Sequence, residues 1–342
     1  MDIGIGLDFT LGLDYDEQAT VSAEAARAGY TSIWTPENVG EDSFLLCYNR
    51  WMATREAVPG GIGTGIGVSP VGMRTPMGFA MSAGTMSKAT GGKFTLGIGT
   101  GQAYNPKYRR TWNMQGKSTL GLMRDYLTII RGLVNGETVD YEGPSAALHG
   151  ARLAINPAPR TPVFLAALGP EMCKLAGEAA DGVSLNWCSA DAIDWSRQLV
   201  REGAEKANRD PSAVKIAEYI RVCVDDDVDV ARRAFARNMM GYALGPLDVK
   251  PQSYRAHFER MGWTEDLKRI DDLRRKQAPV DEVVDAFPPE MLLSVGYFGK
   301  AAGAREHFTR LSDGLDTAIV RVIGARLGID ATRAVLEACA PK

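Results

Sequence analysis

The chain contains little histidine, with three copies among 342 residues: His149, His257 and His307. None of them lies at a metal-ligand spacing from another histidine or from a cysteine, so we expect no metal site. The five cysteines are scattered and form no C-x-x-C pair. This distribution excludes a disulfide framework and is typical of reduced, mostly buried thiols in a cytoplasmic protein.

An excess of charge of one sign is also missing. Lys and Arg number 39 against 42 Asp and Glu, a net charge of −3, so we expect no nucleic-acid partner. The longest uncharged stretch, residues 57–73, is rich in glycine and carries two prolines, which excludes a membrane span there. Residues 2–7 alternate like a strand, without a basic region and cleavage site, so we expect no secretory leader.

What the sequence does contain is a regular alternation of strand and helix patterns. We predict strands at residues 2–7, 31–35, 62–69, 93–98, 161–166, 182–186, 215–224 and 317–322. We predict helices at residues 16–28, 44–58, 76–89, 118–134, 170–180, 190–208, 229–242, 303–311 and 330–338. Because crossover helices between successive strands force parallel pairing, eight such units predict a TIM (β/α)₈ barrel.

The barrel is expected to be a single domain over residues 1–342, with two insertions. Alternating residues around Tyr141-Glu142-Gly143-Pro144 predict a β-hairpin near 138–153, and residues 245–297 form a helical and irregular insertion. The alternative is an open doubly wound sheet. The dinucleotide-binding version of that fold is disfavoured, because no Gly-x-Gly-x-x-Gly follows the first strand.

The stretch from Thr161 to Met172 is the strongest local signal. A short apolar run predicts a buried strand, an Ala-Ala-Leu-Gly link follows, and Pro170 stands where the first turn of a helix accepts proline. A strand that leads directly into a helix leaves free N–H groups and the positive end of the helix dipole at the barrel mouth. This arrangement favours a phosphate site, although most such turns bind nothing.

The other loops at the barrel mouth hold few charges, no histidine, and many small or amide residues. They contain Asp8, Glu37-Asn38, Ser69-Pro70, Gly101-Gln102, Asn105, Ala167–Gly169, Asn186-Trp187 and Asp225–Asp227. Such a rim suits a flat polar ring that the backbone approaches closely, and it does not suit a metal ion. Simpler roles stay open: an ion pair for Glu37, turn closure for Gln102 and Asn105, and backbone contacts for Asn186.

Three blocks of sequence resemble the luciferase-like flavin-dependent family, and more narrowly its branch that uses the deazaflavin coenzyme F420. The blocks are Phe164–Met172 continued by residues 175–187, Ser87–Gly101, and Ser32–Asn38. The resemblance extends in order from Met1 to about Val322. It implies a TIM barrel with insertions, usually a homodimer, that acts on a small-molecule substrate.

The resemblance also implies a deazaflavin across the mouth, with its phosphate tail at the fifth-strand link; FMN is the alternative cofactor. The residues then expected to hold the phosphate tail are Ala166, Ala167, Leu168, Gly169, Pro170, Glu171 and Met172. Those expected near the ring or the ribityl chain are Ser69, Pro70, Thr100, Gly101 and Asn105, and Asn186 is also expected to bind the cofactor. In this family a cis peptide lies in a bulge of the third strand, so we expect a cis Ser69–Pro70 bond.

The sequence departs from the sugar-phosphate dehydrogenases of this branch. They carry an Asp-His pair after the second strand and a Glu after the Gly-Thr-Gly turn, where this chain has Glu37-Asn38 and Gln102. Glu37 and Gln102 are therefore the first and second candidates for proton transfer. Trp34, Trp51, Tyr104 and Trp187 are expected to line the substrate pocket or to pack in the core.

The expected function is an F420-dependent oxidoreductase that transfers a hydride between the deazaflavin and an unidentified small organic substrate. Two alternatives remain: an FMN-dependent luciferase-like monooxygenase, and a catalytically silent protein that binds F420 or flavin.

Overall fold

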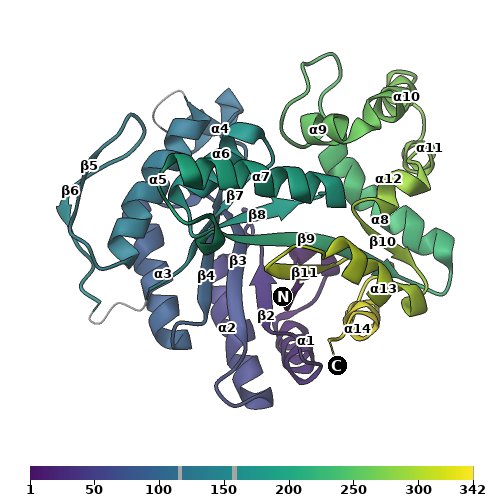
Figure 1. Ribbon diagram of the computed structural model, residues 1–342. Helices are drawn as coiled ribbons and strands as arrows, with labels where there is room; N and C mark the ends of the chain where they lie inside the picture. The colour runs from purple at the N-terminus through teal and green to yellow at the C-terminus, as the bar shows by residue number, and fades with distance from the viewer. Residues whose placement is uncertain (115–117, 156–159, 342) are drawn as a thin grey trace.

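The computed structural model describes residues 1–114, 118–155 and 160–341, and at its centre parallel strands close into a barrel (Figure 1). The barrel strands are β1 (Asp2–Gly6), β2 (Ser32–Thr35), β3 (Gly63–Pro70), β4 (Phe94–Gly99), β7 (Val163–Ala166), β8 (Gly182–Asn186), β9 (Lys215–Val224) and β11 (Thr317–Val322). Each pairs in parallel with its neighbours, and the β8–β9 and β1–β11 pairings close the ring. The predicted TIM barrel is confirmed, and the open-sheet alternative is wrong.

Helices surround the barrel and mostly begin where the sequence predicts. They are α1 (Tyr15–Arg27), α2 (Ser43–Ala57), α3 (Pro76–Thr90), α5 (Thr119–Val134), α6 (Pro170–Ala179), α7 (Ala190–Lys206), α8 (Val228–Ala243), α13 (Ala301–Leu311) and α14 (Ile329–Ala338). Side-chain caps fix several of these starts, because a short polar side chain satisfies N–H groups that the first turn leaves free. Asp14, Asp42, Thr75, Ser118 and Ser189 act in this way.

Three large rings fill the inside of the barrel: Trp34, Phe164 and Tyr219. They fit because several facing strand positions are glycine. A Cβ atom on Gly65 would lie 2.7 Å from the Trp34 ring, and one on Gly182 would lie 2.6 Å from the Phe164 ring. The glycine content of these strands is therefore a packing requirement, and the barrel is solid rather than a channel.

One strand was not predicted. β10 (Gly296–Gly299) pairs with Arg221–Val224 of β9, while β8 pairs with the beginning of β9, so β9 changes partner along its length. The helical insertion was predicted to extend to about residue 297; its last helix, α12, ends at Leu293, and β10 begins at Gly296. A four-residue strand that follows a run of short helices has too few residues to show an alternating pattern.

The helical insertion lies on one side of the barrel, at the right of Figure 1. It contains α9 (Ser253–Phe258), the π-turn η4 (Glu259–Trp263), α10 (Thr264–Arg275), α11 (Val280–Asp285) and α12 (Pro289–Leu293). These elements pack with α8 around Phe235, Phe258 and Phe287, and Trp187 from the barrel rim joins the same cluster. The insertion is thus tied to the mouth of the barrel through Trp187.

An antiparallel hairpin, β5 (Val139–Glu142) and β6 (Ala147–Ala151), lies at the opposite side, where the sequence places one (Figure 1). The buried carboxylate of Asp125 on α5 holds it. Asp125 accepts hydrogen bonds from the Tyr141 hydroxyl at 2.8 Å and from the backbone N–H groups of Ser145 and Ala146 at 2.7 and 3.2 Å.

The end of β3 carries the irregularity that the family resemblance leads us to expect, but at another bond. The β3–β4 register shifts between Ile66 and Ser69, and the cis peptide is Gly67–Val68. The predicted cis Ser69–Pro70 bond is wrong. Gly67 occupies the bulge because a Cβ atom there would lie 2.4 Å from the Tyr219 hydroxyl, so only glycine fits over that ring.

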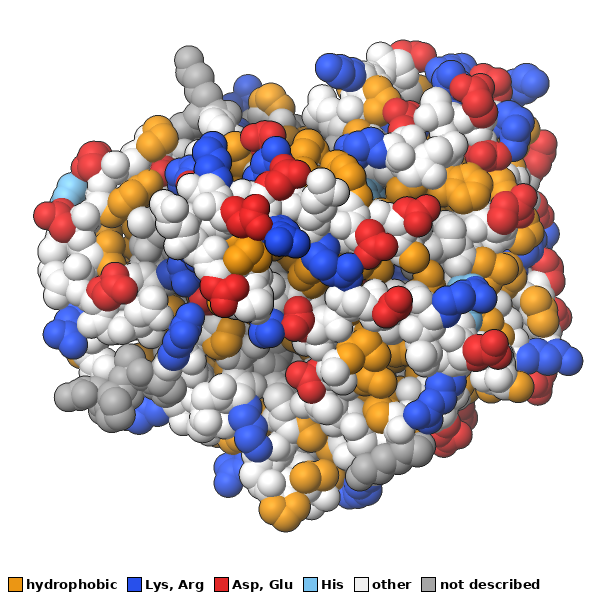
Figure 2. Space-filling model, in the orientation of Figure 1, with side chains coloured by type: hydrophobic (Ala, Val, Ile, Leu, Met, Phe, Trp, Pro, Cys, Tyr) orange, Lys and Arg blue, Asp and Glu red, His pale blue; other side chains and the backbone are white. Residues whose placement is uncertain are grey.

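Basic and acidic side chains are interspersed over the face drawn in Figure 2, without a broad area of one sign. Within the described residues, no helix combines the length and apolar character needed to cross a lipid bilayer.

Candidate functional site

The carboxyl ends of β3, β4, β7 and β8 form a continuous section of the barrel rim. The register pairs Pro70 with Gly99 and Ala166 with Ser184, so these strand ends follow one another around the ring. The predicted cofactor residues lie on this section, because they end these strands or begin the following loops: Ser69, Pro70, Thr100, Gly101, Asn105, Ala166–Met172 and Asn186. The structure therefore brings them to one edge of the mouth.

Glu37, which follows β2, is held in an ion pair. Arg74 donates to both of its carboxylate oxygens, at 2.6 and 2.7 Å, and the Ser69 hydroxyl donates to one of them. Arg74 also pairs with Asp42, and the carboxylate of Glu37 is almost fully buried. This bidentate contact joins the ends of β2 and β3, since the planar guanidinium fixes the carboxylate in one orientation.

The turn after β4 is open to solvent. Gly101 has a positive φ of 53°, and a Cβ atom there would lie 2.8 Å from Pro70, so this turn requires glycine. Gln102 is exposed, and Thr100 and Asn105 are half-buried. Asn105 accepts a hydrogen bond from the Lys107 N–H at 3.0 Å and thereby begins α4 (Pro106–Thr111), a helix that was not predicted.

A buried cationic network that the sequence analysis missed lies at the centre of the mouth. Arg321 of β11 forms an ion pair with Asp8, and its guanidinium lies 5.1 Å above the Tyr219 ring. One of its nitrogens, Nη1, is buried without a hydrogen-bond partner in the described structure, as is the Tyr219 hydroxyl. Burial raises the pKa of the Asp8 carboxyl, but Arg321 and the hydrogen bonds from Thr10 together lower it by more, so its pKa lies below the usual value and the group stays ionised.

Arg221 of β9 lies beside this pair and has amide partners instead of a carboxylate. It donates to Asn186 Oδ1 at 2.5 Å and to Asn238 Oδ1 at 3.2 Å, and it stacks 3.7 Å from the Trp187 ring centre. Asn186 in turn donates to the Tyr254 hydroxyl at 2.6 Å. The two arginines and the one carboxylate leave the centre of the mouth with an excess of positive charge.

Trp34 and Trp187 are core residues by position. Trp34 fills the barrel, and Trp187 is fully buried between Arg221 and the insertion. Trp51 is also buried, whereas Tyr104 is 41% exposed on the turn after β4. Of the four predicted aromatic residues, Tyr104 alone is free to contact a ligand at the mouth.

The beginning of α6 has no side-chain cap. Gly169 is its N-cap residue, Pro170 lacks an N–H group, and the N–H groups of Glu171 and Met172 have no acceptor in the described structure. The space where a Cβ of Gly169 would lie is open to 4 Å. Free N–H groups at the positive end of a helix dipole, in front of open space, are suited to an anion.

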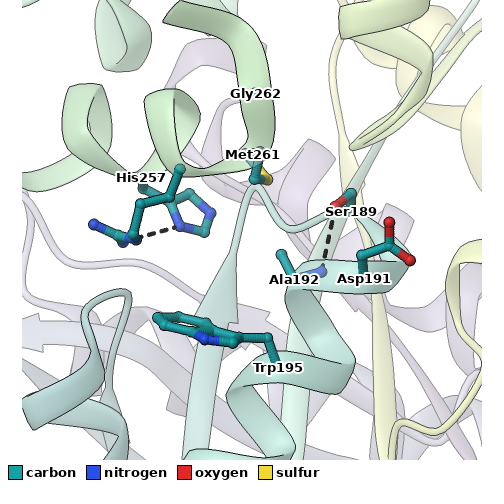
Figure 3. Close-up of a pocket in the computed structure, with 8 residues that line it drawn as sticks. Ser189, Asp191, Ala192, Trp195, His257, Met261 and Gly262 are labelled. Carbon is teal, nitrogen blue, oxygen red and sulfur yellow. Dashed lines mark hydrogen bonds between the residues drawn. The ribbon is translucent and has the colours of Figure 1, made fainter.

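A cavity of about 480 Å³ opens at the start of α7 (Figure 3). It lies between the first turns of α7 and the turn η4, and is lined by Ser189, Asp191, Ala192, Trp195, His257, Arg260, Met261 and Gly262. Arg260 connects it to the strand–helix link, because its Nη2 donates to the carbonyl oxygen of Leu168 at 2.7 Å. His257 donates through Nε2 to the Trp187 carbonyl at 2.9 Å.

Burial keeps the titratable groups behind this cavity neutral. It lowers the pKa of His257 to about 4 and raises the pKa of Glu218 to about 8. The Cys188 thiol lies 3.6 Å from His257 Nε2, and burial raises its pKa well above the usual value. This pair is therefore a buried thiol beside a neutral imidazole, not an activated nucleophile. In the described ranges no three His, Cys, Asp or Glu side chains are arranged to hold a metal ion.

The closed ring of eight parallel strands with surrounding helices defines the class of this protein as a TIM barrel. The sequence model described as luciferase-like monooxygenase matches residues 4–317. The chain belongs to this family.

The similar sequences in this family are named either as reductases or as dehydrogenases. A 5,10-methylenetetrahydromethanopterin reductase from Methanolobus tindarius is 32% identical over 61% of this chain and 62% of its own length. The chain thus spans less than two thirds of that relative. A reductase of the same name from Archaeoglobus fulgidus is 28% identical over 67% of both chains. An F420-dependent glucose-6-phosphate dehydrogenase from Mycolicibacterium fortuitum is 28% identical over 69% of both.

Solved structures agree on the fold over the whole chain. A coenzyme F420-dependent tetrahydromethanopterin reductase from Methanopyrus kandleri superposes with a TM-score of 0.75 at 20% identity, covering 100% of this chain and 98% of its own. An F420-dependent secondary alcohol dehydrogenase superposes with a TM-score of 0.74 at 18% identity, covering 99% and 98%.

Proposed function

We propose that this protein is a coenzyme F420-dependent oxidoreductase that transfers a hydride between the deazaflavin and a small organic substrate. The relatives described above support this, because several of them are F420-dependent by name. The observation on this chain that carries the proposal is the uncapped start of α6 at the rim, with its free N–H groups and open space.

The residues present fit the coenzyme. The N–H groups of Glu171 and Met172 would hold the phosphate, and Gly169 leaves room for it. Pro70, Thr100 and Gly101, on the adjacent strand ends, would lie along the ring or the ribityl chain, and Asn105 and Asn186 would border them. The deazaflavin, when bound, supplies the carbon that accepts or donates the hydride.

The protein then has to position the substrate and exclude water, because hydride transfer needs no protein nucleophile. Arg221 and Arg321 give the mouth a positive potential. Glu37 and Gln102 remain the proposed candidates for proton transfer. The saturated contacts of Glu37 favour a positioning role, whereas exposed Gln102 is free to meet a substrate.

The second candidate is an FMN-dependent monooxygenase. The family description favours it, and a solved monooxygenase in complex with FMN superposes with a TM-score of 0.66 at 17% identity. The uncapped α6 start suits the phosphate of FMN as well as that of F420. A protein that binds either cofactor without turnover is the third candidate.

Direct binding separates these candidates. The purified protein is titrated with F420 and, separately, with FMN, and the fluorescence of each is followed. We expect saturable quenching of F420 and weak or no binding of FMN. Tight FMN binding without F420 binding would overturn the proposal. Oxidation or reduction of bound F420 in the presence of a candidate substrate then excludes the silent protein.

A further inference from the structure

One guanidinium dominates the charge of the cavity between α7 and η4. Arg260 lines it, and none of the described residues offers Arg260 a carboxylate within ion-pair distance. Its recorded contacts are the Leu168 carbonyl, the His257 ring nitrogen at 3.5 Å and the Trp195 ring at 5.6 Å. These contacts use Nη2 or the flat face of the guanidinium. The N–H groups of Nε and Nη1 can therefore donate to a ligand.

The remaining polar groups of the cavity add little charge. His257 is neutral at physiological pH, because burial lowers its pKa to about 4. Asp191 is exposed at the rim, and Figure 3 shows it on the side of the cavity away from His257. Ser189 is already committed to capping α7 through the Ala192 N–H at 3.3 Å. The cavity therefore has one cationic wall beside a neutral imidazole and an aromatic ring.

The position of the cavity indicates which anion it would take. Arg260 is bonded to Leu168, which immediately precedes the uncapped start of α6. A molecule whose phosphate sits on the α6 N–H groups would meet this cavity next, along the rim toward α7. His257, which lines the cavity, donates to the carbonyl oxygen of Trp187, and the buried Trp187 ring stacks on Arg221 at the barrel mouth.

We propose that this cavity binds the carboxylates of the coenzyme tail beyond the phosphate, with Arg260 as their cationic partner and Trp195 as an apolar wall. This inference rests on the proposed F420 dependence. It adds a reason for cofactor choice, because F420 continues past its phosphate into an acidic oligoglutamyl tail, whereas FMN ends at its phosphate. Selection for F420 would then be made at the tail as well as at the ring.

The test compares coenzymes and needs no variant to begin. Wild-type protein is titrated with F420 that carries glutamyl residues and with the same deazaflavin ending at its 5′-phosphate, which has no carboxylate beyond the phosphate. We expect the glutamylated form to bind about tenfold more tightly, and the difference to shrink as salt is raised, because it is an ionic contact. Equal affinities for the two forms would overturn the proposal.

Variants then assign the effect to the arginine. Arg260→Gln should remove the preference for the glutamylated form and leave the affinity for the form that ends at the 5′-phosphate unchanged, whereas Arg260→Lys should retain part of the preference. Arg201→Gln is the matched control, because Arg201 lies on the exposed face of α7 and pairs with Glu205. Its titrations should match the wild type.

Equal weakening of both coenzymes by Arg260→Gln would place the arginine at the phosphate or in the fold, and would also overturn the proposal. Failure of the underlying function looks different, because neither deazaflavin would then bind the wild type. Circular dichroism and the melting temperature of each variant establish that it is folded.

Discussion

The protonation state of one buried carboxyl group, Glu218, can be tested directly. Glu218 of β9 is fully buried, with Oε1 accepting the Cys188 N–H at 2.7 Å and Oε2 without a partner. Burial raises its pKa to about 8, so the folded protein holds it protonated at neutral pH. The unfolded chain releases that proton near the ordinary value of about 4.5.

Replacing Glu218 should therefore stabilise the protein in mild alkali. The raised pKa contributes stability that is complete below about 4.5 and is lost as the pH rises through about 8. Glu218→Gln keeps the acceptor for Cys188 but cannot ionise. We expect urea unfolding at pH 9 to show a gain on the order of a few kcal/mol over the wild type, and little difference at pH 5.

Glu205→Gln, on the exposed face of α7, is the control and should show no such pH dependence. A Glu218→Gln variant less stable than the wild type at both pH values would contradict the buried neutral carboxyl.

The Glu37–Arg74 pair permits a second test at this scale. Because Arg74 occupies both oxygens of Glu37, we expect Glu37→Gln to reduce the free energy of unfolding by about 1–3 kcal/mol. The pH profile of turnover with F420 should keep its shape, since a positioning residue exchanges no proton with the substrate. If the pH profile of the Glu37→Gln variant lost one limb, Glu37 would be the proton-transfer group after all. Asp42→Asn, which removes the half-exposed partner of Arg74, serves as the comparison.

The sequence could indicate the rim residues but not the arginines behind them. Glu37, Ser69 and Gly101 follow strand ends and belong to recognisable blocks, so their place on the rim was predictable. Arg221 and Arg321 lie inside strand patterns, and the neighbouring sequence does not indicate that a charged side chain points into the barrel. Arg260 belongs to an insertion whose short helices give no long periodic pattern. Contacts between residues distant in the sequence decided all three.

At the scale of one element, α6 differs from the capped helices around it. Its N-cap is Gly169, whereas α1, α2, α3 and α5 begin with a side-chain cap. The sequence predicted this strand–helix link because Pro170 marks a first turn and the apolar run before it is short. It could not say whether the N–H groups stay free, since a distant side chain can satisfy them.

A cap introduced at this position should separate stability from binding. Gly169→Asp places a carboxylate over the free N–H groups, and the φ and ψ of −99° and 160° accept any residue. We expect the free energy of unfolding to rise by a few tenths of a kcal/mol. We expect the affinity for F420 to fall at least about tenfold, because the carboxylate takes the place of the phosphate and repels it.

Gly169→Asn caps the helix without the charge and should weaken F420 binding less than Gly169→Asp. Unchanged affinity in Gly169→Asp, measured by fluorescence titration, would remove the α6 start from the binding site.

The glycines of the barrel strands give a test of the packing inside β2 and β3. Gly65→Ala should destabilise the protein by about 2–4 kcal/mol, because its methyl group would lie 2.7 Å from the Trp34 ring in a filled interior. Gly241→Ala on α8 is the matched control. It meets no atom within 4 Å and should stabilise the protein by about 0.5–1 kcal/mol. Urea denaturation of both variants measures the difference; equal effects would contradict the packing described for the interior.

At the scale of the whole molecule, the barrel depends on contact between distant parts of the chain. β1 pairs with β11, so Asp2 lies beside Thr317. The number and order of the βα units predicted this closure, since parallel strands with right-handed crossovers leave few other topologies. The additional strand β10 and the change of partner along β9 were not predictable, because neither alters the local pattern of β9 itself.

Removing residues 1–7 should therefore abolish the fold, because it opens the ring and exposes edges of β2 and β11 at once. Replacing residues 140–150 with two glycines should leave the barrel intact and lower the melting temperature by a few degrees, because the hairpin lies outside the ring. Circular dichroism and gel filtration distinguish the two results. A cooperative, monodisperse product from the first deletion would contradict a closed barrel.

The solid interior of the barrel has a kinetic consequence. Because Trp34, Phe164 and Tyr219 fill it from wall to wall, no ligand passes through from the far end. Under the proposed function, coenzyme and substrate would then share one entrance. Kinetics of ordered binding, in which one of the two must bind before the other, are the expected result.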